Sequence, residues 1–155
     1  MYYMPYMNGL KNGNKLPVIF FDACLTAKLD FNFTDLEEYY PRIIDLLASI
    51  FGLSTNPSDF YQCFAWSFMA KEGGGAIASV GATRTAYTWV DSTGVYGGAG
   101  YMDVHFFDSY YEGVTVGQML TGSQNAYIHQ VGLDYFTIEE FILLGDPSLM
   151  VGGYP

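Results

Sequence analysis

Cys24 is placed where a thiol could act as a nucleophile. It ends the stretch LPVIFFDAC (16–24), whose opening proline and β-branched and aromatic residues predict a buried strand. In open α/β sheets, ligands bind in the crevice beyond the carboxyl ends of the strands. The following residues 25–28 (LTAK) supply small side chains, a hydroxyl and a cation, and a nearby cation favours a reactive thiolate. Placement alone leaves a buried structural cysteine as an alternative.

The second cysteine and the two histidines give weaker signals. Cys63 lies in YQCFAWSF (61–68), on the apolar face of a predicted helix, which indicates a core residue. His105 and His129 stand among aromatic or apolar neighbours in predicted helices, where a hydrogen-bonded structural histidine is the favoured interpretation. Either could serve Cys24 as a general base, depending on its distance from the thiol. No Cys/His spacing is typical of zinc, so the sequence predicts no metal and no cofactor.

Two glycine-rich stretches have the composition of phosphate-binding loops but not their order along the chain. GGGAIASVG (73–81) precedes its predicted strand, whereas a phosphate-binding loop follows a strand and begins a helix. GVYGGAG (94–100) is not followed by Lys-Ser or Lys-Thr. These patterns argue against a nucleotide-binding protein.

Strands and helices alternate along the chain, which predicts an α/β fold with a mostly parallel sheet and helices on both faces. The expected elements are a strand over 16–21, a helix over 34–51 interrupted near Pro41, a loop over 54–59, a helix over 59–72, a strand over 75–83, a turn-rich loop over 85–100, helical segments on both sides of Gly113, and a short closing helix before a turn at 145–147. The chain shows no repeat or linker, so we expect a single domain over residues 1–155.

The composition argues against several classes of partner. The chain of 155 residues has 6 basic and 16 acidic side chains and a net charge of −10. Nucleic-acid binding requires a basic stripe, and anionic membrane surfaces attract basic segments, so neither partner is expected. No apolar run approaches the length of a membrane span, and residues 1–17 lack the basic and apolar regions of a signal peptide.

Three segments, taken in order, resemble the gingipain-like cysteine peptidases, which have the caspase-like fold. They are FFDACLTAKLDF (20–31), FMAKEGGGAIASVGATRTAY (68–87) and FILLGDPSLMV (141–151). In that family a strand ends at the nucleophilic cysteine, a later Gly-Ala strand ends in GAT or GSS, and an LGDPSL-type motif lies near the domain end. The resemblance covers most of residues 8–151. It implies the C-terminal part of a catalytic domain, with Cys24 as the nucleophile and a protein or peptide as the substrate.

The resemblance also implies that the general base lies outside this chain. The family's base is a histidine in a His-Gly segment on the preceding strand, and residues 1–23 contain no histidine. MNGLKNGNKLP (7–17) resembles the linker that follows that segment. We therefore expect an incomplete domain that has little peptidase activity without its missing N-terminal part, from a parent protein that is secreted or at the cell envelope. The alternative is a non-catalytic binding or assembly module of the same fold at a cell envelope.

In the resembling family, the residues after the GAT-type strand border the pocket for the side chain that precedes the scissile bond. In this chain Arg84, Tyr87 and Trp89 occupy that stretch. The two aromatic rings would supply flat apolar walls. Arg84 could favour an acidic substrate side chain, but an ion pair with a structural carboxylate such as Asp91 or Asp103 is the favoured interpretation.

Overall fold

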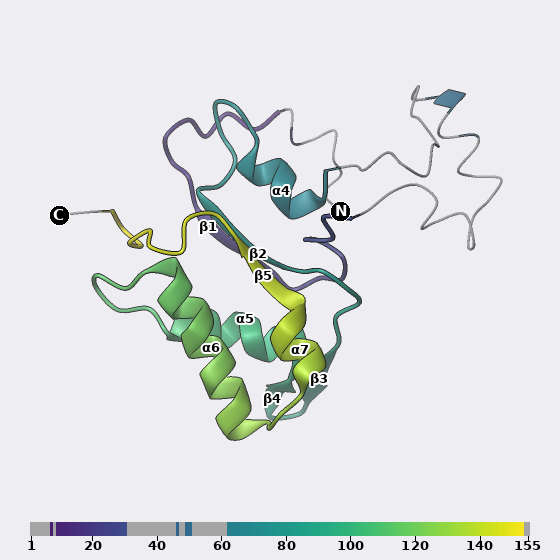
Figure 1. The fold of residues 1–155 in the computed structure, drawn as a ribbon, viewed down its shortest axis with the longest axis vertical. Coiled ribbons are helices and arrows are strands. Elements are labelled where there is room, and N and C mark those ends of the chain that lie inside the picture. The colour runs from purple at the N-terminus through teal and green to yellow at the C-terminus, as the bar shows by residue number, and fades with distance from the viewer. Residues whose placement is uncertain (1–6, 8, 31–45, 47–48, 51–61, 154–155) are drawn as a thin grey trace.

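The computed structural model describes residues 7, 9–30, 46, 49–50 and 62–153. The elements within these residues are, in order, β1 (Val18–Phe21), α4 (Phe64–Met69), β2 (Ala78–Ala82), β3 (Thr88–Asp91), β4 (Gly94–Gly97), α5 (Gly98–Asp108), α6 (Val116–Gln130), α7 (Tyr135–Glu140) and β5 (Phe141–Leu144) (Figure 1). The loop predicted over 54–59 and nearly all of the helix predicted over 34–51 lie outside the described residues.

β1, β2 and β5 form a sheet in that spatial order. β1 and β2 run parallel, with Phe21 opposite Gly81, and β5 runs antiparallel to β2, with Phe141 opposite Ala82. The α/β class and the parallel pairing of the first two predicted strands are confirmed. Because β1 and β2 are parallel and in register, the chain leaves both strands at the same edge of the sheet.

Helices cover both faces of this sheet, with α4 on one face and α5, α6 and α7 on the other (Figure 1). β2 is buried along its whole length, and successive side chains point to opposite faces. Val80 therefore packs in one apolar cluster with Phe106 of α5 and Met119 of α6. On the opposite face, the Ser79 hydroxyl donates a hydrogen bond of 3.3 Å to the carbonyl of Ala65 in α4. Burial on both faces fixes β2 as the centre of the described sheet.

The antiparallel strand β5 differs from the prediction, which placed a short helix and then a turn at this end of the chain. The helix is present as α7, and the Asp134 side chain caps it by accepting a hydrogen bond from the Thr137 amide. The apolar run FILL (141–144) then pairs with β2. Four apolar residues directly after a helix carry no local signal that separates strand from helix, so the pairing with β2 decided the outcome.

The prediction of a turn-rich loop over 85–100 is wrong, because this segment contains the hairpin β3–β4 and the start of α5. The turn of the hairpin is built by Asp91, whose carboxylate accepts hydrogen bonds from the amide and hydroxyl of Thr93. Gly94 follows with φ of +130°, a conformation that side chains disfavour. All four residues of β3 are exposed, so the sequence lacks the apolar alternation that identifies a half-buried strand.

The second predicted helix is shorter in the structure, and the helices around Gly113 form as predicted. α4 begins after Cys63, which is its N-cap, and ends at Met69. α5 and α6 lie on either side of Gly113. Thr115 and Gln118 begin α6 with a capping box, in which each side chain bonds the other residue's amide.

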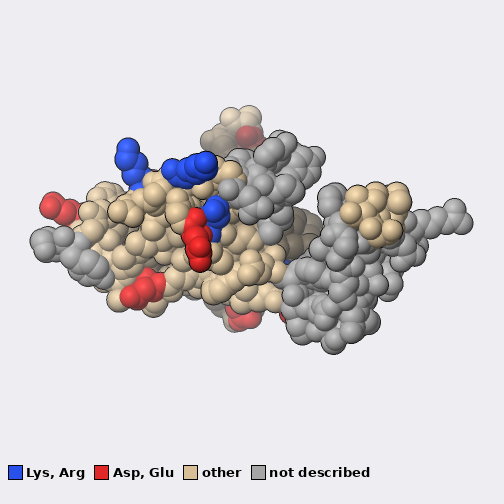
Figure 2. Space-filling model, turned by 90° about the horizontal axis from the view of Figure 1, so that it is seen from above, with Lys and Arg blue, Asp and Glu red and all other residues tan. Residues whose placement is uncertain are grey.

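Charged side chains are sparse on one face of the described surface. On the face seen in Figure 2, most described residues are neither acidic nor basic. Within the described part of the chain, no helix is long and apolar enough to cross a membrane.

Candidate active site

Cys24 lies beyond the carboxyl end of β1, and its side chain is exposed. The last residue of β1, Phe21, is paired with Gly81 near the end of β2. The segments that follow the two strands therefore leave the sheet together. We call residues 22–30 the Cys24 loop and residues 83–88 the β2 exit.

Three hydrogen bonds join the Cys24 loop to the end of β2 and to the β2 exit. The Ala27 amide donates to the Ala82 carbonyl at 2.9 Å, and the Leu25 amide donates to the Arg84 carbonyl at 3.0 Å. The Cys24 thiol donates to the carbonyl of Ala86 at 3.2 Å. These contacts place the thiol against the segment that was predicted to border the substrate pocket.

The close approach of the Cys24 loop to β2 requires glycine at position 81 of that strand. Thr26 is buried, and its hydroxyl donates to the Ala23 carbonyl at 3.1 Å. A Cβ atom at Gly81 would lie 2.7 Å from the Thr26 Oγ1 and 3.1 Å from the Ala27 Cβ. Gly81 of the GAT motif therefore lets the Cys24 loop lie directly on β2.

A second set of contacts ties the Cys24 loop to the hairpin and to α5. The Thr88 hydroxyl donates to the Asp22 carboxylate at 3.3 Å and accepts the Gly100 amide at 3.0 Å. In α5, burial raises the pKa of Asp103, and the nearby Asp22 carboxylate raises it further. The start of β3 and the first turn of α5 are thus held next to the Cys24 loop.

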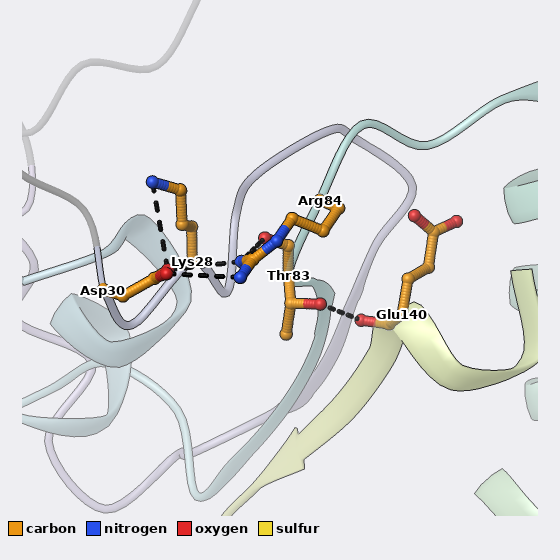
Figure 3. Close-up of polar contacts among 5 residues, drawn as sticks. All are labelled: Lys28, Asp30, Thr83, Arg84 and Glu140. Atoms are coloured by element: carbon orange, nitrogen blue, oxygen red, sulfur yellow. Dashed lines mark hydrogen bonds and ion pairs between the residues drawn. The ribbon is translucent and has the colours of Figure 1, made fainter. Parts of the chain in front are cut away.

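Arg84 forms an ion pair with a structural carboxylate, as favoured from the sequence, but the partner is Asp30 (Figure 3). Both terminal guanidinium nitrogens contact the Asp30 carboxylate at 3.2 Å. Asp91 and Asp103 were the wrong partners, because Asp91 closes the hairpin turn and Asp103 lies on α5 beside Asp22. The ion pair joins the far end of the Cys24 loop to the β2 exit.

Tyr87 and Trp89 follow Ala86 closely, and neither ring lies in the core. Tyr87 is 58% exposed and Trp89 is 41% exposed. The Tyr87 ring lies 6.2 Å from the ring of Phe136, centroid to centroid. Trp89 packs over Gly97, where a Cβ atom would lie 2.6 Å from the indole ring. Their role in substrate binding stays a prediction.

The structure shows no contact between either histidine and Cys24. His105 Nδ1 lies 3.5 Å from a carboxylate oxygen of Asp108, and its ring lies 4.0 Å from that of Tyr101. α5 begins beside the β2 exit, and Phe107, near its other end, lines a groove of about 900 Å³ at the amino end of β1. His105 therefore lies toward the end of the sheet opposite Cys24.

His129 is exposed on α6, two residues after the buried Tyr127. Residues two apart lie on nearly opposite sides of a helix. The hydroxyl of Tyr127 accepts the Gly98 amide at the start of α5, so Tyr127 faces the rest of the domain. His129 accordingly points away from the edge that carries Cys24.

A comparison of the chain with models of known protein families shows the family to which it belongs. The profile of Peptidase family C25 matches residues 4–152, which include β1, the Cys24 loop, β2 and the closing LGDPSL motif. The chain belongs to peptidase family C25. This is the gingipain family of the caspase-like clan, so the chain forms a cysteine peptidase domain region. No curated protein and no solved structure matches the chain.

Glu140 is a residue of this C25 domain that the sequence analysis did not single out. Its main-chain carbonyl accepts hydrogen bonds from the amide and the hydroxyl of Thr83, at 2.8 and 3.0 Å (Figure 3). Its side chain is 4% exposed, and within the described part of the chain neither carboxylate oxygen has a hydrogen-bond partner. Burial, followed by the charge of Asp134, raises the pKa of Glu140 to about 7. The main chain of Glu140 therefore supports the start of the β2 exit, while its side chain is a buried carboxyl without a hydrogen-bond partner among the described residues.

The two cysteines of the C25 domain differ sharply in accessibility, which predicts selective alkylation. Cys24 is exposed, whereas Cys63 is 5% exposed and packs with Ala27 and Ala65. Iodoacetamide should modify Cys24 at least about tenfold faster, because Cys63 reacts only after local opening of the structure. Mass spectrometry of the two cysteine peptides measures both rates. Faster modification of Cys63 than of Cys24 would contradict the exposed placement of Cys24. As a control, the two cysteines should react at equal rates when the chain is unfolded in denaturant.

Proposed function

We propose that Cys24 is the nucleophile of a cysteine endopeptidase, and that a histidine outside this chain is its general base. The thiolate attacks the scissile carbonyl, the protonated histidine donates its proton to the leaving amine, and water then hydrolyses the thioester. The observation that carries this proposal is the position of Cys24. It is exposed beyond the carboxyl end of β1, at the edge of the sheet where ligands bind in α/β folds.

Two observations support a base from another segment. His105 is engaged by Asp108 and Tyr101, and His129 is exposed on the outer side of α6. The described sheet has the order β1-β2-β5, so among the described residues only β2 is paired with β1. The residues of β1 are all apolar and half-buried. A further strand that carried the base could pair with this free edge and bring its histidine to the sheet edge that bears Cys24.

The test compares the 155-residue chain with a chain extended upstream through the next histidine-bearing segment of the same protein. The extended chain should hydrolyse peptides, and the shorter chain should be slower by about 10²–10⁴-fold, the usual contribution of a general base. Replacing the upstream histidine by alanine in the extended chain should reproduce the loss. Comparable hydrolysis by the shorter chain would show that the base lies within it. If neither chain hydrolyses peptides, the domain is a binding or assembly module rather than an enzyme.

We also propose that Tyr87 and Trp89 line the pocket for the substrate side chain that precedes the scissile bond. Both rings are exposed and lie one and three residues from Ala86, which holds the Cys24 thiol. Arg84 borders the same segment, although substrate binding by its guanidinium would require the ion pair with Asp30 to open.

In the extended chain, replacing Tyr87 or Trp89 by alanine should lower kcat/KM by about tenfold or more for substrates whose side chain covers the ring, as the loss of a buried aromatic contact implies. Substrates with glycine at that position should change much less. Tyr111→Ala is the matched control, because Tyr111 is as exposed as Tyr87 but lies beyond the end of α5. An equal loss across all substrates would argue against a specificity pocket.

A further inference from the structure

Leu25, directly after Cys24, has an unusual backbone conformation. Its φ is +60°, and it is the only residue other than glycine with a positive φ among the residues that the structure describes. The left-handed region is disfavoured for side chains with a Cβ atom, and such outliers persist where surrounding contacts hold them. The Leu25 side chain is 42% exposed, so burial of this side chain does not account for the conformation.

Hydrogen bonds on both sides of Leu25 hold this conformation. Its amide donates to the Arg84 carbonyl at 3.0 Å, and its carbonyl accepts the Lys28 amide at 3.2 Å. The next residue, Thr26, is buried against Gly81, and its hydroxyl bonds the Ala23 carbonyl. The turn is thus closed around Leu25 by contacts from its own loop and from the β2 exit.

The left-handed residue separates two side chains with opposite surroundings. On one side of it, Thr26 is buried on β2, and on the other side Cys24 is exposed with its thiol on the Ala86 carbonyl. If Leu25 had an ordinary extended or helical φ, the chain would leave the turn in a different direction. The thiol could not then reach Ala86 while Thr26 kept its buried place.

We propose that Leu25 is a positioning residue, and that its left-handed backbone, not its side chain, directs the Cys24 thiol to the β2 exit. The inference rests on the proposed role of Cys24 as the nucleophile. It adds the device that directs this nucleophile to the Ala86 carbonyl, in the segment that continues into Tyr87 and Trp89. Residues that accept a left-handed conformation should therefore replace Leu25, whatever their side chains.

The test replaces Leu25 by glycine, asparagine and valine in the 155-residue chain and measures the rate of Cys24 alkylation by iodoacetamide. Glycine and asparagine tolerate a positive φ, whereas β-branched valine does not. Leu25→Gly and Leu25→Asn should keep the parent rate within about twofold and a melting temperature no lower than the parent's. Leu25→Val should lower the melting temperature by about 2–4 °C. It should also raise the alkylation rate about threefold or more, because the hydrogen bond from the thiol to Ala86 is lost.

Leu29 provides the matched control, since it is an exposed leucine of the same loop without a positive φ. Leu29→Val should change neither quantity. If Leu25→Val keeps the parent rate and melting temperature, or if Leu25→Gly and Leu25→Asn change as much as Leu25→Val, the backbone of Leu25 does not position the thiol. Alkylation does not require peptide hydrolysis, so this result stands apart from the test of peptidase activity. Absence of hydrolysis with the expected alkylation pattern would count against the proposed function alone.

Discussion

Replacing Cys24 by alanine is expected to lower kcat/KM of the upstream-extended peptidase by at least about 10³-fold. Removal of the thiol eliminates the covalent step, and only substrate binding and polarisation of the scissile carbonyl remain. The alanine side chain fits an exposed position and leaves the hydrogen bonds from Leu25 and Ala27 to β2 and its exit intact. The loss should therefore appear in kcat, with KM and the melting temperature nearly unchanged.

Cys63→Ala is the matched control for the loss of one thiol. Cys63 is 5% exposed at the start of α4 and packs with Ala27 and Ala65, whereas Cys24 is exposed to solvent. Its removal should lower the free energy of unfolding by about 1 kcal/mol through a small cavity and leave kcat/KM unchanged. If Cys24→Ala kept more than about one tenth of the parent kcat/KM, Cys24 would not be the nucleophile.

Replacing Glu140 by glutamine is expected to stabilise the domain by about 3 kcal/mol at pH 8, and to have no such effect near pH 4. Burial raises the pKa of Glu140 from 4.5 to about 7 in the folded state. Well below pH 4.5 the carboxyl is neutral in both the folded and the unfolded state, so folding buries no charge. As the pH rises toward 7, the unfolded chain ionises first and the folded state becomes less stable. Above 7 the folded state carries a buried carboxylate without a hydrogen-bond partner among the described residues.

Chemical denaturation of the parent and of Glu140→Gln between pH 4 and pH 8.5 measures this difference. The amide of glutamine is as poorly partnered as the carboxyl, so its cost is the same at every pH and only the charge term varies. Glu139→Gln is the control, because Glu139 is exposed and its replacement removes the same formal charge. That variant should stay within about 0.5 kcal/mol of the parent at every pH. A stability difference for Glu140→Gln that does not grow between pH 4.5 and pH 8 would show that Glu140 is not desolvated.

Glu140 is also joined to the candidate active site, through its main chain. The Glu140 carbonyl holds both the amide and the hydroxyl of Thr83, at the start of the segment that contacts the Cys24 loop. An attacking thiolate is favoured at higher pH, whereas the buried Glu140 carboxyl makes the folded state more stable at lower pH. The pH of greatest stability should therefore lie below the pH of greatest reactivity.

The sequence by itself determined the elements whose signals are local. The apolar run before Cys24 predicted β1, and the break at Gly113 separated α5 from α6, because periodicity and capping depend on neighbouring residues. The ordered motifs around Cys24, Gly81 and the closing LGDPSL also identified the family, which the profile match confirms. The nucleophilic role of Cys24, which the family resemblance implies, stays a prediction.

Contacts between distant segments were decided only by the tertiary structure. The strand β5 depended on pairing with β2, and the hairpin had no buried face to reveal it. Arg84 pairs with Asp30, which is 54 residues away in the sequence, although the predicted partners Asp91 and Asp103 are nearer to it along the chain. Leucine and glutamate have no sequence signal for a left-handed backbone or for a buried, unpartnered carboxyl, so Leu25 and Glu140 could not be predicted. Their states depend on surrounding atoms that folding brings from other parts of the chain, and local propensity does not encode that environment.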